Sequence, residues 1–181
     1  MKGVVFTEFM ELVEDKFSFE TADKIVEGSD LASGGAYTSL GTYDHEELLQ
    51  MVTLLSEMSD APIPDLVRTF GLHLANRFAA AFPQFFENTD YFKFLEGVDG
   101  YIHVEVRKLY ADAELPKFDT ERVDENVMVM HYSSARPFAD LAHGLVLGTA
   151  EYFGEAVDVD YQDTSPEHAP GTKATFTITR K

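Results

Sequence analysis

The stretch VMVMHYSSAR, residues 127–136, joins a run of strand-forming residues to a compact set of hydrogen-bond donors. Val127–Tyr132 has the composition of a β-strand. Tyr132, Ser134 and Arg136 then occupy every second position, so an extended segment would project all three to one side. Two hydroxyls and a guanidinium all donate to anionic oxygens, and the arginine fork fits a carboxylate with two bonds. The stretch therefore predicts a strand that ends in a carboxylate-binding site.

Two plainer interpretations of these donors remain open. Polar residues between a strand and a helix often cap the helix. Arg136 also has 32 acidic residues in the chain with which it can pair.

A second candidate group lies upstream, at His103. A neutral imidazole is a good ligand for iron. A haem could use both groups, because its iron needs an axial ligand and its two propionates need hydrogen-bond donors. On a helical wheel, however, His103 falls at the edge of the apolar stripe of its predicted helix. At such an edge a hydrogen-bonded or exposed histidine is commoner than a metal ligand.

Five other histidines compete for the role of ligand. We expect His45 and His168 to be exposed, and His131 to point away from Tyr132 along the strand. The other two lie on predicted helices, where each either lines a pocket or packs in the core: His73 and His143.

Composition and charge exclude several classes of function. The formal charge of −18 argues against a nucleic-acid partner and against binding to an anionic membrane surface. The absence of cysteine removes disulfides, thiolate metal sites, iron–sulfur clusters and covalent haem attachment. No signal-peptide pattern or membrane-spanning run is present, so we expect a cytoplasmic protein. At 181 residues, one domain covering 1–181 is expected.

The order of the predicted elements indicates an α+β fold. Helices are expected first and strands last, with one helix inserted between the strands. Asp44-x-x-Glu47 resembles a capping box before one of these helices. The expected helices cover 3–17, 20–28, 45–58, 64–81, 90–110 and 137–153, and the expected strands cover 127–132, 157–161 and 174–179. Gly34-Gly35 lacks the context of a phosphate loop, and no Gly-x-Ser-x-Gly elbow supports a hydrolase.

Several motifs together resemble the H-NOX family, the haem nitric oxide/oxygen binding domains related to the regulatory domain of soluble guanylate cyclase. MKGVVF at 1–6 is similar to the family's opening, and IHVEVRKLY at 102–110 is similar to its proximal-ligand helix. Pro116 follows at the family's spacing, and Tyr132-x-Ser134-x-Arg136 matches its signature. The resemblance covers essentially the whole chain.

The resemblance implies non-covalent ferrous haem b, with His103 as the proximal iron ligand. It assigns the propionates to Tyr132, Ser134 and Arg136, and it places Pro116 against the porphyrin. It also implies a mainly helical distal N-terminal part and a proximal C-terminal part with an antiparallel sheet. The distal positions near the haem would be apolar: Val5, Phe9, Leu74, Leu141 and Leu145.

Leu141 departs from the pattern of the oxygen-binding members of the family. Family members that bind oxygen stably carry a tyrosine five residues after the motif arginine, and this chain has leucine there. Without a donor, bound oxygen loses a charge-assisted hydrogen bond, whereas nitric oxide depends less on one. We therefore expect a sensor that binds nitric oxide, and also carbon monoxide, but discriminates against oxygen. His73 or His143 would reverse this expectation by acting as a distal donor.

The resemblance further implies a non-enzymatic protein that signals in trans. Its partner would be a histidine kinase or a cyclic-dinucleotide enzyme, that is, a diguanylate cyclase or phosphodiesterase. The alternatives are a haem enzyme of the peroxidase type, which would need distal acid–base groups, and a haem-free interaction domain with the same fold.

Overall fold

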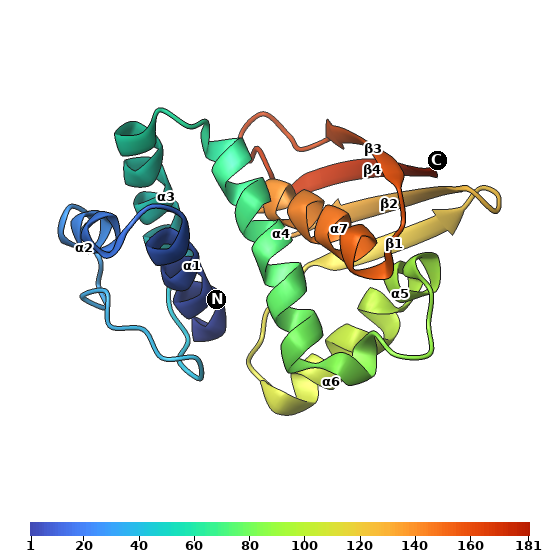
Figure 1. The fold of residues 1–181 in the computed structure, drawn as a ribbon, viewed down its shortest axis with the longest axis horizontal. Coiled ribbons are helices and arrows are strands. Elements are labelled where there is room, and N and C mark those ends of the chain that lie inside the picture. The colour runs from blue at the N-terminus through green and yellow to red at the C-terminus, as the bar shows by residue number, and fades with distance from the viewer. The chain divides into compact units, whose positions relative to one another are not determined.

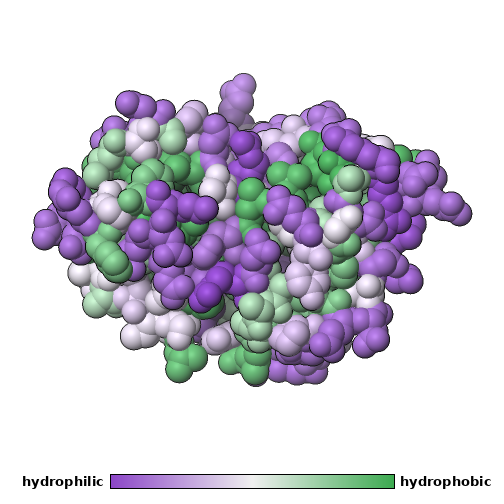
Figure 2. Space-filling view, in the orientation of Figure 1, coloured by the Kyte–Doolittle hydropathy of each residue, from purple (hydrophilic) through white to green (hydrophobic).

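The computed structural model describes residues 1–181, which form two compact units, Met1–Phe70 and Gly71–Lys181 (Figure 1). The boundary falls within one long helix, α4 (Ile63–Ala81). Whether the chain acts as a single domain stays a prediction. Polar and charged side chains cover much of the surface seen in Figure 2, in keeping with the formal charge of −18. No helix is both long enough and apolar enough to cross a membrane.

The first unit is helical, as predicted. It contains α1 (Gly3–Lys16), α2 (Phe19–Glu27), α3 (His45–Ser59) and the start of α4. Asp44 caps α3 by accepting a hydrogen bond from the Glu46 main-chain N–H. The predicted capping box is only half correct, because Glu47 does not complete it. The buried Glu47 carboxylate instead accepts from the hydroxyls of Ser33 and Tyr37, which pins the 29–42 loop to α3.

The second unit packs helices against a four-stranded antiparallel sheet. The strands are β1 (Lys117–Arg122), β2 (Val127–Ser133), β3 (Val157–Asp163) and β4 (Lys173–Arg180), in the order β1-β2-β4-β3. Helix α7 (Ala139–Phe153) lies across one face of the sheet (Figure 1). Met128, Met130, Tyr132, Phe176 and Ile178 alternate towards this buried face. The predicted α+β fold is confirmed.

A helical segment in three pieces precedes the sheet. After a short 3-10 turn, η1 (Pro83–Phe85), α5 (Tyr91–Gly97) continues through the π-helical turn η2 (Val98–Ile102) into α6 (His103–Leu109). The sequence predicted one regular helix over 90–110, and it did not reveal the π-turn. It also missed strand β1, although the other three strands were predicted.

The Tyr132–Arg136 motif does not adopt the conformation expected from its spacing. Strand β2 ends at Ser133, and the chain then turns before α7 begins at Ala139 rather than at Pro137. The prediction that an extended segment projects all three donors to one side is therefore wrong. The turn, rather than strand alternation, determines where Ser134 and Arg136 lie.

Candidate functional site

His103 is the first residue of α6 and follows directly after the π-turn. Its side chain is buried, with Nδ1 3.4 Å from the Asp99 carboxylate one turn earlier. No hydrogen bond is made by its other ring nitrogen, Nε2, so that atom is available to a ligand. Metal-binding histidines usually donate one ring N–H to a carboxylate or carbonyl and bind the metal through the other nitrogen.

Burial also sets the protonation of this imidazole. It lowers the pKa of His103 below the usual value, and the nearby Asp99 carboxylate opposes that effect. The neutral ring, which is the form that ligates iron, is therefore favoured near neutral pH.

Aromatic contacts connect His103 to the Tyr132 motif through Phe118. The Phe118 ring centroid lies 5.9 Å from that of His103 and 5.5 Å from that of Tyr132. Phe118 is on β1 and faces Tyr132 directly across the strand pair. Helix α6 and the donor motif are thus linked through one aromatic ring of the second unit.

The three donors of the motif are brought together by the turn after β2. Burial raises the pKa of Tyr132, opposed by interactions with the Ser134 side chain and the Phe138 main chain, so its hydroxyl keeps its proton. The Ser134 hydroxyl accepts from the main-chain N–H of Arg136 at 3.0 Å. Helix α7 begins after Phe138 with no side-chain cap, so the capping interpretation of these residues does not hold.

Arg136 is ion-paired with Glu114. One guanidinium nitrogen contacts the Glu114 carboxylate, and the other donates to its main-chain carbonyl at 3.0 Å. The pair connects the motif to the segment between α6 and β1, which also carries the half-buried Pro116. A carboxylate bound by Arg136 would share the guanidinium with Glu114 or displace it.

The remaining predicted pocket residues lie in both units. Leu74 is buried on α4, whereas Leu141 and Leu145 are half-buried on α7. In the first unit, Val5 and Phe9 lie on α1, and the buried Phe9 ring meets Phe70 edge-on.

His143 and His73, the two candidate distal donors, have different surroundings. The ring of His143 stacks on Tyr161 at a centroid distance of 5.1 Å and lies near Phe176, so it packs against the sheet. His73 is half-buried on α4. His131 is exposed and contacts Thr175, whereas its neighbour Tyr132 is buried on the opposite face of the sheet, as predicted.

The donor set is consistent with a haem. Nowhere do three or more histidine, aspartate or glutamate side chains cluster so that they could hold a bare metal ion. His103 can supply one nitrogen ligand, so a metal bound there must bring its other ligands with it, as a porphyrin does. The nearby hydroxyls of Tyr132 and Ser134 and the guanidinium of Arg136 suit the anionic propionates of such a porphyrin.

Comparisons with known proteins agree. The family model described as "Haem-NO-binding" matches residues 2–161. The chain belongs to this family, whose members are called H-NOX proteins. Comparison with curated proteins gives no match.

Solved H-NOX structures match the whole chain. A variant of the K. algicida protein in the Fe(II) unliganded state is 39% identical, with a TM-score of 0.93 over 100% of this chain and 97% of its own. The IWP-051-bound Fe(II)CO protein from Shewanella woodyi is 46% identical, with a TM-score of 0.82 over 100% and 95%. The S. oneidensis protein in the Fe(II)NO state is 25% identical, with a TM-score of 0.87 over 100% and 99%.

Membership in the H-NOX family makes this chain a member of a group of haem-based gas sensors. H-NOX domains bind haem and are usually not enzymes themselves, so the peroxidase alternative is not favoured. Three contacts at the site were missed by the sequence reasoning: Asp99, Glu114 and Phe118. Asp99 had a detectable signal, since it stands four residues before the candidate ligand, but Glu114 and Phe118 come close only through the fold.

Proposed function

We propose that this H-NOX protein senses nitric oxide at ferrous haem b held by His103. The observation that carries the proposal is the buried, neutral imidazole whose Nδ1 faces Asp99 and whose Nε2 has no hydrogen-bond partner. When bound, the haem would supply the ferrous iron that takes the gas. His103 would act as the proximal ligand, and Asp99 would orient its ring.

Tyr132, Ser134 and Arg136 would bind the propionates. The support for this assignment is their convergence at the turn after β2, together with the protonated state of the buried Tyr132 hydroxyl. Arg136 would contribute the strongest bond, because it is charged and can donate twice. Pro116, in the segment that Glu114 ties to Arg136, would press on the macrocycle as the family resemblance implies.

Discrimination against oxygen would come from side chains that donate no hydrogen bond. Leu141 and Leu145 on α7 and Leu74 on α4 are all aliphatic, and we propose Val5 and Phe9 of α1 as further apolar members. The ring of His143 packs against Tyr161 and Phe176 of the sheet, and this position argues against its use as a distal donor. Carbon monoxide, which also needs little hydrogen bonding, would bind as well.

The signal would pass through the segment that carries His103. Weakening of the bond between His103 and the iron would free α6 from the position that the ligand imposes. The outer surface of η2 and α6 exposes Tyr101, Val104 and Leu109, so movement of this segment changes an accessible surface. We propose a separate histidine kinase or diguanylate cyclase/phosphodiesterase as the receiver.

The test is a His103→Gly variant reconstituted with haem, with His131→Gly as the matched control on an exposed histidine. We expect resonance Raman spectra of the ferrous His103→Gly protein to lack the iron–histidine stretching band, and added imidazole to restore it. The control should keep the band. An unchanged band in the His103→Gly protein would overturn the assignment of the ligand.

A further inference from the structure

The outer face of the sheet in the second unit carries an unusual row of side chains. Lys117 on β1 pairs with Ser133 on β2, and Ser133 pairs in turn with Lys173 on β4. Cross-strand partners point to the same face, so two lysines flank one hydroxyl. In the next row on this face, Asp119 pairs with His131.

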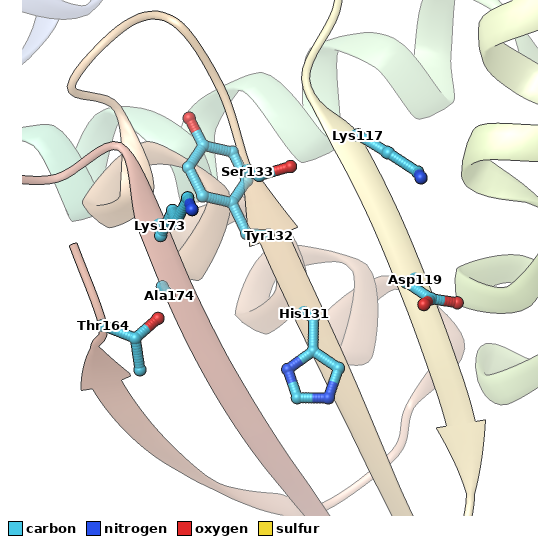
Figure 3. A pocket seen from close by; sticks show the side chains of 8 residues that line it. All are labelled: Lys117, Asp119, His131, Tyr132, Ser133, Thr164, Lys173 and Ala174. Atoms are coloured by element: carbon cyan, nitrogen blue, oxygen red, sulfur yellow. The ribbon is translucent and has the colours of Figure 1, made fainter. Parts of the chain in front are cut away.

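A hollow of about 320 Å³ lies over these two rows (Figure 3). Thr164, from the segment that follows β3, completes its polar lining. Tyr132 and Ala174 also border the hollow, but their side chains are buried on the opposite face of the sheet, so it meets their main chain. The hollow is polar and open to solvent.

The charges of the two lysines are not neutralised within the protein. Most basic side chains have an acidic partner, as Arg122 has Glu96 and Arg136 has Glu114. Lys117 and Lys173 have no carboxylate within 4.0 Å, although the chain has 32 acidic residues. Two like charges on one row repel each other, and an anion between them would remove that cost.

We propose that this hollow binds a phosphate group, either as inorganic phosphate or as a phosphate monoester. Lysine ammoniums bind phosphate as point charges with three donors each, and they can approach a tetrahedral anion from two sides. Ser133 and Thr164 add hydroxyl donors between and beside them. His131 adds a ring nitrogen, since its Nδ1 contacts Thr175 and its Nε2 is unused.

Asp119 narrows the choice of ligand. Its carboxylate lines the same hollow and repels a second anionic group at that edge. A ligand that places a hydroxyl there would instead donate a hydrogen bond to it. The Asp119 carboxylate therefore favours a phosphate monoester with a neighbouring hydroxyl, such as a nucleoside monophosphate, over a polyphosphate.

The test is titration of the haem-loaded, carbon monoxide-bound ferrous protein, followed by amide NMR shifts at constant ionic strength. Separate titrations use inorganic phosphate, adenosine monophosphate and sodium chloride. We expect saturable shifts at Ser133 and Lys173 with the first two and none with chloride. The double variant Lys117→Gln/Lys173→Gln should weaken binding by about tenfold or more. Lys16→Gln, at an exposed lysine of α1 that also has no ion pair, should leave it unchanged.

The two phosphate probes distinguish a phosphate monoester from inorganic phosphate as the ligand of the hollow. Tighter binding of adenosine monophosphate than of inorganic phosphate would support a monoester ligand, and equal binding would support phosphate itself. Absence of saturable shifts with both probes would overturn the proposal. Equal shifts with chloride, or an unaltered response in the double variant with its fold intact by NMR, would overturn it as well.

Discussion

Asp99 Oδ1 lies 3.4 Å from Nδ1 of His103, and the π-turn between them sets this spacing. A carboxylate that accepts from Nδ1 increases the electron density on Nε2 and strengthens its bond to a metal. We therefore expect Asp99→Asn to shift the iron–histidine stretching band of the ferrous protein to lower frequency in resonance Raman spectra. Glu105→Gln, at a carboxylate that pairs with Lys108, serves as the control. A band that stays in place in Asp99→Asn would show that the contact does not act on the ligand.

Arg136 should be a main determinant of haem retention. A charge-assisted bond to a propionate is worth about 1.5–3 kcal/mol, so Arg136→Ala should release haem about 10- to 100-fold faster. The measurement is transfer of haem to an excess of an apo-globin acceptor. Arg122→Ala, which removes an arginine of β1 that pairs with Glu96, should not change the rate. Equal rates in the two variants would contradict the propionate assignment.

Leu141 is expected to control the response to oxygen. Leu141→Tyr would introduce a hydroxyl donor on α7 at the position given by the family resemblance. We expect the variant to form a stable complex with oxygen that the parent protein does not form, because polarised oxygen gains a hydrogen bond. Absorption spectra of the ferrous proteins in air provide the measurement. Leu141→Phe, similar in size but without the hydroxyl, should behave as the parent, and stable oxygen binding by that control would contradict the explanation.

Gly148 allows α7 to approach the C-terminal part of α4 closely. A Cβ at this position would lie 2.7 Å from the Ala75 Cβ and 3.0 Å from the Leu72 carbonyl oxygen. Gly148→Ala should therefore lower the free energy of unfolding by about 1–3 kcal/mol. The helical Gly97 has no atom within 4 Å of such a Cβ, so Gly97→Ala should raise stability by about 0.5–1 kcal/mol. Urea denaturation of both variants tests these two predictions. Equal effects of the two substitutions on the free energy of unfolding would contradict them.

Asp90 should make the stability of the second unit depend on acid pH. As the N-cap of α5 it accepts from the Lys93 main-chain N–H, and this bond, helped by the Lys93 and Arg180 charges, lowers the pKa of Asp90 below its usual value. A lowered pKa in the folded state means that the stabilisation is present above the unfolded-state pKa and is lost as pH falls through the folded-state pKa. Asp90→Ala should cost about 1 kcal/mol near neutral pH.

The pH dependence of this effect is checked by urea denaturation between pH 7 and pH 2. The difference between the parent and Asp90→Asn, which keeps an oxygen acceptor but not the charge, should shrink as pH falls below about 4. A difference that does not change with pH would show that the charge of Asp90 has no role.

The sequence predicted helices and strands well where the spacing of apolar residues is regular, and poorly where that spacing is interrupted or absent. The long amphipathic helices and strands β2, β3 and β4 were predicted from their periodicity. Strand β1 was missed because it lies at the sheet edge and contributes only Phe118 and Thr120 to partly buried positions. Its remaining residues are charged and exposed, so it has almost no apolar signal.

The π-turn explains why a helical wheel alone was a poor guide to His103. A regular wheel places His103 at the edge of the apolar stripe, where a hydrogen-bonded or exposed side chain is expected, and the side chain is hydrogen-bonded but also buried. The turn over Val98–Ile102 adds a residue to the helical cycle and rotates the following residues, so His103 becomes buried. Similarly, the spacing of Tyr132, Ser134 and Arg136 was recognised for the wrong geometric reason, since a turn rather than a strand brings them together.

The most direct test of the account is an absorption spectrum of the haem-reconstituted, dithionite-reduced protein. It is recorded first without oxygen, then after removal of the reductant and admission of air, and finally with nitric oxide under anaerobic conditions. We predict five-coordinate ferrous haem that forms no stable complex with oxygen and binds nitric oxide. A stable oxygen complex, or a ferrous haem that does not bind nitric oxide, would contradict the account.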